Sequence, residues 1–371
     1  MLKMLLACLV MAWTPCLAQE AQPPAHDPQA EHAATQPKAE PAKKAPYPFT
    51  PVAKADVVGT GARAMVLVPD VRYPGEIFLP FMERNKAHYT MHAITLPGYG
   101  GTAQPPPKPE GEFGAWENNA ALAIAQYIQE KGLQKPIVVG LGLGGRPVCI
   151  LAAEHADLVG EVILLNTQFF WPLPTIENPT PDERVEFIKK EMLPRMARIP
   201  EAEWLRRKKL NMPQVCIDEK RSEEIAAMAM RTGREAEDGY VVDFAARDLR
   251  PLLPGLSMPV MLLESTGLGD AALTFRERQE ALARAHAAMI PAGKVVIYRQ
   301  TRHFAFEDRP VEFDAAIASF LKGEQPPDLD PAPVPYNNVP TVDAPPPTGR
   351  IDPSAPSTPP TETPANPNAP K

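Results

Sequence analysis

Glycines between Val138 and Val148 form the first pattern that points to chemistry. The stretch VVGLGLGGRPV places Gly140, Gly142 and Gly145 at the spacing G-x-G-x-x-G. Glycines at this spacing let a dinucleotide pyrophosphate approach the first turn of a helix. The same stretch also fits G-x-S-x-G, a strand-to-helix turn that presents a catalytic serine, with Gly142 in the place of the serine. The first interpretation predicts an oxidoreductase, and the second predicts a turn without its nucleophile.

Charge and metal-binding patterns argue against several other classes of function. The net charge of −7 opposes a nucleic-acid-binding surface. The sequence contains no C-x-x-C or H-E-x-x-H motif and no carboxylate cluster with metal spacing, so we expect neither a metal nor another cofactor. Cys149 and Cys216 are the two cysteines outside the N-terminal segment; a disulfide between them is one option, and a buried free thiol at Cys149 is favoured.

The elements that must position the glycine turn alternate between strands and helices. Short aliphatic or β-branched runs predict strands, and segments with helical spacing lie between them. This alternation predicts an α/β fold with a mostly parallel sheet and helices on both faces. The predicted strands are 64–68, 89–96, 137–139, 161–165, 259–263 and 294–298, and the predicted helices include 116–130, 146–155, 275–288 and 310–321.

One interval interrupts the alternation. Between Leu165 and Pro259 the patterns are helical without a convincing strand, which predicts an inserted helical cap at about 168–255. The cap opens with Phe169, Phe170 and Trp171. Large rings suit an apolar ligand pocket, although the same rings would also serve to pack the cap onto the sheet.

The two ends of the chain differ from its middle. Residues 1–18 carry a lysine, a short apolar run and small residues before position 18, as in a secretory signal peptide. Residues 19–51 and 324–371 are rich in Ala and Pro, so we expect a disordered linker and a disordered tail around a domain at 52–323. These features predict a periplasmic or secreted protein without a membrane span.

The position of the glycine pattern argues against a dinucleotide site. A dinucleotide-binding pattern should follow the first strand, and an acidic residue should end the second. Here at least two predicted strands precede the glycines, and the next strand ends at Asn166, which is not acidic. Dinucleotide binding therefore remains the weaker interpretation.

Three stretches resemble the α/β-hydrolase family. PIVVGLGLGGRPVCILAAEHADLVGEVILLN resembles its nucleophile elbow, the following helix and the next strand; HAITLPGYGGT resembles the preceding strand and turn; TRHFAFEDRPVEFDAAIASFL resembles its C-terminal segment. The resemblance implies an α/β-hydrolase-like sheet and a catalytic order of nucleophile, acid and histidine. It places the nucleophile position at Gly142, the histidine at His303 and the acid at Asp270, with Glu264 as the alternative acid.

The sequence departs from this family at the residues that perform the chemistry. Gly142 has no side chain and cannot form an acyl-enzyme. The resemblance places the oxyanion region at Asp70, Val71 and Leu143, where Pro69-Asp70 replaces the usual His-Gly. A carboxylate pointing inward there would repel a developing oxyanion.

These departures lead to two main hypotheses. The first is a non-catalytic or strongly degenerate serine hydrolase that binds a small apolar ligand or an unidentified protein partner. The second is an active hydrolase or lyase that uses a His303 and Asp270 dyad without a serine nucleophile.

Overall fold

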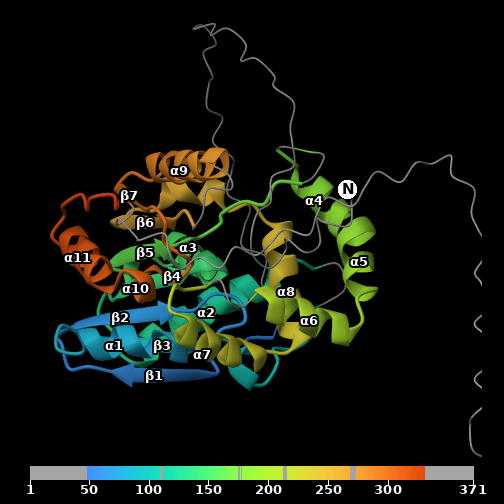
Figure 1. Cartoon of the computed structure of the whole chain (residues 1–371), viewed down its shortest axis with the longest axis horizontal. Helices are drawn as coiled ribbons and strands as arrows, with labels where there is room; N and C mark the ends of the chain where they lie inside the picture. Colours follow the sequence, from blue (N-terminus) through green and yellow to red (C-terminus); the bar gives the residue numbers. More distant parts are fainter. Residues whose placement is uncertain are drawn as a thin grey trace, which may run out of the picture. The chain divides into compact units, whose positions relative to one another are not determined.

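A seven-stranded sheet lies at the centre of the computed structural model, which describes residues 48–108, 112–173, 176, 178–211, 215–267 and 273–330. The strand order is β1-β3-β2-β4-β5-β6-β7, and only β1 runs antiparallel to its neighbour (Figure 1). The predicted mostly parallel sheet is confirmed. The strands are β1 (Lys54–Val58), β2 (Arg63–Val68), β3 (Tyr89–Thr95), β4 (Ile137–Leu141), β5 (Glu161–Leu165), β6 (Val260–Ser265) and β7 (Gly293–Tyr298).

The central strands β2, β4 and β5 are mostly apolar because helices cover both faces of the sheet. In β2, Met65 and Leu67 join one hydrophobic cluster while Val66 and Val68 join the other. The strand that the sequence patterns missed, β1, has only β3 as a neighbour. Its sequence KADVV includes an exposed lysine and an exposed Val57, so it lacks the aliphatic run that marks the central strands.

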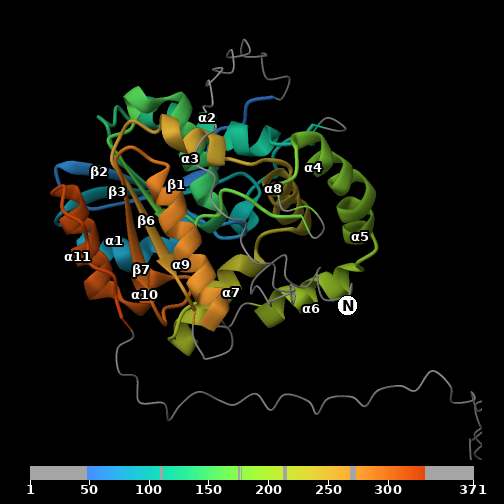
Figure 2. The same ribbon diagram turned by 90° about the horizontal axis from the view of Figure 1, so that it is seen from above.

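Helices form a layer on each face of the sheet (Figure 2). One hydrophobic cluster includes residues of α1, α10 and α11, and the opposite cluster includes residues of α2, α3 and α9. The helix predicted at 310–321 has the predicted bounds. The helices are α1 (Leu79–Asn85), α2 (Ala115–Glu130), α3 (Gly145–Glu154), α9 (Leu273–Ala288), α10 (Ala305–Asp308) and α11 (Pro310–Leu321).

The predicted helical insertion lies between β5 and β6. Its first helix begins with a capping box, in which the Thr180 hydroxyl accepts a hydrogen bond from Glu183 N–H and the Glu183 side chain accepts one from Thr180 N–H. In Figure 1 the helices α4, α5, α6 and α8 gather at one end of the sheet. The helices of the cap are α4 (Pro181–Phe187), α5 (Leu193–Ala197), α6 (Glu201–Asn211), α7 (Glu219–Met230) and α8 (Arg234–Ala246), with a π-helical turn (Ile188–Met192) between α4 and α5.

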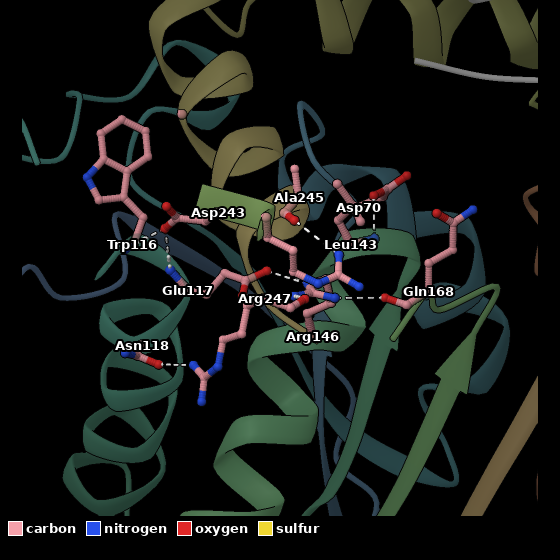
Figure 3. A network of polar contacts seen from close by, with 12 residues as sticks. Asp70, Trp116, Glu117, Asn118, Leu143, Arg146, Gln168, Asp243, Ala245 and Arg247 are labelled. Carbon is pink, nitrogen blue, oxygen red and sulfur yellow. Dashed lines mark hydrogen bonds and ion pairs between the residues drawn. The ribbon is translucent and has the colours of Figure 1, made fainter. Parts of the chain in front are cut away.

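Buried charges connect the cap to the sheet domain (Figure 3). Asp243 of α8 accepts hydrogen bonds from the backbone N–H groups of Trp116 and Glu117 at 2.8 and 3.3 Å, which satisfies free donors at the start of α2. Arg146, in the first turn of α3, forms an ion pair with Glu117 and donates to the carbonyl of Arg247 at 3.0 Å. These contacts bring α2, α3 and α8 together.

The domain extends beyond the boundary expected at residue 323. Leu329 forms a parallel bridge with Tyr298 of β7, and the backbone N–H of Leu329 donates to Ile297 O at 2.8 Å. The Asp328 carboxylate accepts from Ile297 N–H at 2.9 Å. Residues 324–330 therefore belong to the described domain, because they pair with the open edge of β7. The expected signal peptide and most of the two expected tails lie outside the described residues.

Both cysteines of the domain are buried free thiols, as was favoured for Cys149. Burial raises the pKa of the Cys149 thiol to about 12 and that of the Cys216 thiol to about 11. In the part of the chain that the structure describes, no helix is long and apolar enough to span a bilayer.

Candidate functional site

The glycine-rich turn follows β4 and has the backbone of a nucleophile elbow. Leu141 is extended, with φ −103° and ψ 131°, and Gly142 has a positive φ of 54° before the chain enters α3. Side chains would not fit at its neighbours: a Cβ on Gly144 would overlap Pro69 O, and one on Gly145 would overlap the Thr167 side chain. The glycine pattern therefore reflects close packing of the elbow against the loops after β2 and β5.

Asp70 occupies the place expected to bind an oxyanion. Its Oδ1 accepts hydrogen bonds from the backbone N–H groups of Val71 and Leu143, each at 2.7 Å. These are the two amides that the resemblance assigned to the oxyanion region, and Figure 3 shows the Asp70 carboxylate directed at Leu143. The carboxylate was expected to repel an oxyanion, and in the structure it is itself the acceptor for both amides.

His303 faces the second oxygen of the same carboxylate. Its Nε2 lies 2.9 Å from Asp70 Oδ2. The Asp70 side chain is 12% exposed and that of His303 is 23% exposed, so both groups remain accessible from outside the protein. The structure thus joins the predicted histidine to the oxyanion region through one acidic side chain.

The same carboxylate also overlaps the position of a nucleophile side chain. A Cβ built on Gly142 would lie at 2.5 Å or less from Cγ, Oδ1 and Oδ2 of Asp70. Real Cβ atoms essentially never approach other heavy atoms so closely, so a serine at this position is incompatible with Asp70 as it lies here. The missing side chain at residue 142 is what leaves room for the carboxylate.

The loop at Arg302 and His303 is held by two polar side chains. Sequence patterns did not assign either of them to the site. Asn166, with φ 50°, donates from Nδ2 to His303 O at 2.7 Å and accepts from Ser265 N–H at 2.6 Å. Asp308 accepts from the backbone N–H groups of Arg302 and Ile217 at 2.8 and 2.6 Å. Asp308 thus ties the histidine loop to the cap.

The acid of a triad is not assigned by the described residues. Asp270 lies outside them. Glu264, the alternative, is on β6, and burial raises its pKa to about 8. Its side chain lies 3.5 Å from Gln279 Nε2, and the described hydrogen bonds of His303 do not include Glu264. A largely protonated Glu264 is a poor match for the carboxylate that orients a catalytic histidine.

The three rings expected to line a pocket make packing contacts. Phe169 is buried and meets the ring of His286 edge to face at 5.1 Å. The Arg250 guanidinium lies 3.7 Å from the centre of the Phe170 ring, and Trp171 stacks on Phe244 at 6.0 Å. These contacts fasten the start of the cap, and a pocket lined by the three rings stays a prediction. Within the described residues, no group of three or more His, Cys, Asp or Glu side chains is placed to hold a metal ion.

Comparison with known proteins identifies the scaffold. A sequence profile described as the alpha/beta hydrolase family matches residues 65–316. The chain belongs to the alpha/beta hydrolase family. With the geometry of the elbow, membership decides between the two interpretations of the glycine pattern in favour of the nucleophile turn.

Similar proteins from other organisms include enzymes that act on esters. A pimeloyl-[acyl-carrier protein] methyl ester esterase of Vibrio vulnificus (strain YJ016) is 25% identical over 248 residues, which is 66% of this chain and 89% of that protein. An esterase from Rhodococcus sp. ECU1013 superimposes with a TM-score of 0.55 at 17% identity, covering 72% of this chain and 94% of that one. An enol-lactonase from Burkholderia xenovorans LB400 superimposes with a TM-score of 0.54 at 18% identity, covering 74% of this chain and 100% of that one. These two structures share the fold.

Proposed function

We propose that this protein does not hydrolyse carboxylic esters by the serine mechanism and that it binds a small apolar ligand at the Asp70–His303 pair. One observation carries the proposal. The Asp70 carboxylate lies where the nucleophile side chain and the substrate oxyanion of a serine hydrolase would lie. The site is therefore built on a carboxylate and a histidine in place of a serine and a histidine.

The Asp70 carboxylate and the developing oxyanion of an ester would compete for the same two amides. Serine-type ester hydrolysis needs backbone donors that are free to bind a developing oxyanion. Here the Val71 and Leu143 donors already bind an acceptor on the chain, and charge-assisted hydrogen bonds of this kind are stronger than those to a neutral carbonyl. An ester carbonyl would have to displace Asp70 and would still find no side chain at Gly142 to attack it.

A small apolar ligand is proposed because a relative named above is a methyl ester esterase and because large rings lie at the start of the cap. The cap is inserted after β5, so it follows the same edge of the sheet that carries the elbow. A protein partner at the same site is the other occupant that the degenerate site would allow.

An exported location is a separate part of the proposal. It rests on the lysine, apolar run and small residues of the first 18 positions. Fractionation of bacteria that express the full chain with a C-terminal tag should place the protein, shortened by about that segment, outside the cytoplasm. A full-length protein in the cytoplasmic fraction would contradict export.

The test of the proposed function uses a fluorophosphonate probe, which labels activated serines. The wild-type protein should remain unlabelled, and its hydrolysis of p-nitrophenyl acetate should equal that of a His303→Ala variant. The double variant Gly142→Ser with Asp70→Ala restores a hydroxyl and frees both amides, so it is the variant in which labelling is expected. Its matched control is Gly142→Ala with Asp70→Ala, which has the same free amides without a hydroxyl. Stoichiometric labelling of a serine in the wild type would refute the proposal.

A further inference from the structure

We infer that the ligand of this site carries a neutral hydrogen-bond donor, such as an alcohol hydroxyl, at the end that meets the Asp70–His303 pair. The inference rests on the proposed function, in which this pair binds a small apolar ligand. It goes beyond that function by naming the chemical group that the pair recognises. Esters, ketones and ethers, which only accept hydrogen bonds, are excluded as that group.

The hydrogen bonds of the Asp70 carboxylate leave one acceptor position open. An ionised carboxylate accepts only, through about four lone pairs on its two oxygens. Oδ1 accepts from the backbone N–H groups of Val71 and Leu143, each at 2.7 Å, so both of its lone pairs are in use. Oδ2 has the Nε2 atom of His303 at 2.9 Å, which uses a third lone pair. The remaining lone pair of Oδ2 is left for a ligand.

The tautomer of His303 follows from the same contact. Because a carboxylate cannot donate, the proton between the two groups lies on His303 Nε2. This N–H is directed at Oδ2 and is not free for a ligand carbonyl. The two amides that would bind a carbonyl oxygen in a serine hydrolase are also occupied, by Oδ1. The pair therefore offers a ligand an acceptor, while these three donors are already bound.

The open acceptor position can be reached from outside the protein. The side chains of Asp70 and His303 are 12% and 23% exposed. The carboxylates of Glu117 and Glu237, which meet guanidinium groups, are only 4% and 2% exposed. The missing side chain at Gly142 contributes to this difference, because a Cβ there would overlap the Asp70 carboxylate. Of these three carboxylates, Asp70 is the one that a molecule from solvent can approach.

The charges around Asp70 favour a neutral donor over a cationic one. Two buried cations share Glu237: Arg72 Nη2 lies 2.8 Å from its Oε1, and Lys208 Nζ lies 2.9 Å from its Oε2. Burial alone would lower the pKa of the Arg72 guanidinium, but nearby groups, Glu237 and Asp70 among them, raise it. The charges of these four side chains sum to zero. A hydroxyl leaves this balance unchanged, whereas an ammonium group would add a positive charge beside Arg72.

The experiment compares isomeric probes that differ in their polar end. Pentan-1-ol donates through its hydroxyl, whereas 1-methoxybutane has the same atoms and only accepts. In titrations of the full-length protein followed by ligand-observed NMR, the Kd of pentan-1-ol should be lower by about 10- to 100-fold, the usual effect of a hydrogen bond to a charged group. Pentylammonium should bind more weakly than pentan-1-ol. Equal affinities for the two isomers would overturn the inference, and tighter binding of pentylammonium would overturn the assignment of a neutral donor.

Asp70→Asn gives a readout that a merely structural role of Asp70 would not give. The amides of Val71 and Leu143 require an oxygen at the position of Oδ1, so the new NH₂ group takes the place of Oδ2. One of its N–H groups faces His303 and the other is free to donate to a ligand. The preference should therefore shift toward 1-methoxybutane.

The matched control is Asp182→Asn, which changes an exposed carboxylate in the first turn of α4 and should keep the preference of the wild type. An unchanged preference in Asp70→Asn would contradict the inference.

The wild type locates the probe even if Asp70→Asn does not fold. The imidazole NMR signals of His303, identified by their loss in His303→Ala, should shift when pentan-1-ol is added. Binding without this shift would overturn the inference. If neither isomer binds, the apolar ligand of the proposed function fails together with the inference. The claim that the protein lacks a serine mechanism fails only if the fluorophosphonate probe labels a wild-type serine.

Discussion

The elbow and the cap anchor each contain a carboxylate within the same part of the fold, but the partners of the two carboxylates differ. At the cap anchor, Glu117 meets the Arg146 guanidinium, and the side chains are 4% and 0% exposed (Figure 3). At the elbow, Asp70 meets two backbone N–H groups and His303, and both side chains keep contact with solvent. One carboxylate pairs with a buried guanidinium, while the other has two backbone amides and an imidazole as its partners.

The two carboxylates therefore differ in the partners that hold them. A buried ion pair costs desolvation of both ions, so it persists where the geometry satisfies both partners. Arg146 also donates to the carbonyls of Gln168 and Arg247, which completes its hydrogen bonding. Asp70 is also fixed in place, but by backbone amides, which orient a carboxylate without cancelling its charge.

Removing one partner at the cap anchor should have the largest effect on stability. Glu117→Ala leaves the Arg146 guanidinium buried without its counter-ion, and we expect a loss of about 3–5 kcal/mol in the free energy of unfolding. Urea denaturation at pH 7 measures it. Glu191→Ala, which breaks the exposed pair with Arg195, is the control, with an expected loss of at most about 1 kcal/mol. Equal losses in the two variants would show that the anchor is not a sealed pair.

A side chain at the elbow should have the next largest effect. Gly142→Ser adds strain at positive φ, about 1–3 kcal/mol, and an overlap with Asp70, so we expect a total loss of about 3 kcal/mol. Gly132→Ser is the matched control, since Gly132 has φ 62° and no atom within 4 Å of its Cβ position. Gly132→Ser therefore measures the cost of backbone strain without the cost of an overlap. If Gly142→Ser costs no more than Gly132→Ser, Asp70 does not fill the elbow.

Glu264 is a third carboxylate, and its contribution to stability should depend on pH. Burial raises the pKa of Glu264 from 4.5 to about 8, so its contribution to stability is fully present below pH 4.5 and is lost as the pH rises through about 8. The side chain at position 264 of Glu264→Gln carries no charge, so the stability of this variant relative to the wild type should increase as the pH rises from 4.5 to about 8. Because the side chain is partly exposed, we expect a gain of about 1–2 kcal/mol, the equivalent of roughly one pKa unit.

Thermal unfolding of the wild type and Glu264→Gln at pH 5 and pH 8.5 measures that gain. Glu277→Gln changes an exposed carboxylate of α9 and should show no difference between the two pH values. If the difference in stability between Glu264→Gln and the wild type is the same at pH 5 and pH 8.5, Glu264 is ionised in the folded protein at both pH values.

Much of the scaffold could be predicted from the sequence, because it depends on apolar patterning. The contacts of Asp70 at the centre of the site could not. The runs at 64–68 and 161–165 mark strands buried on both faces, and the glycine turn marks the elbow. Strand β1 was missed because its sequence, KADVV, has exposed side chains and no aliphatic run. The role of Asp70 depends on the direction of its side chain across the elbow, where residues 70 and 142 are far apart in sequence. The spacing of residues in the sequence does not predict the direction in which the Asp70 side chain points.

A double-mutant cycle between residues 70 and 142 tests most directly whether the Asp70 carboxylate occupies the place of the nucleophile side chain. The free energy of unfolding is measured for the wild type, Gly142→Ser, Asp70→Ala and the double variant. If Asp70 fills the elbow, the loss caused by Gly142→Ser should be smaller in the Asp70→Ala background by about 0.5–3 kcal/mol, the range found for residues in contact. Losses that add without any coupling would contradict the account.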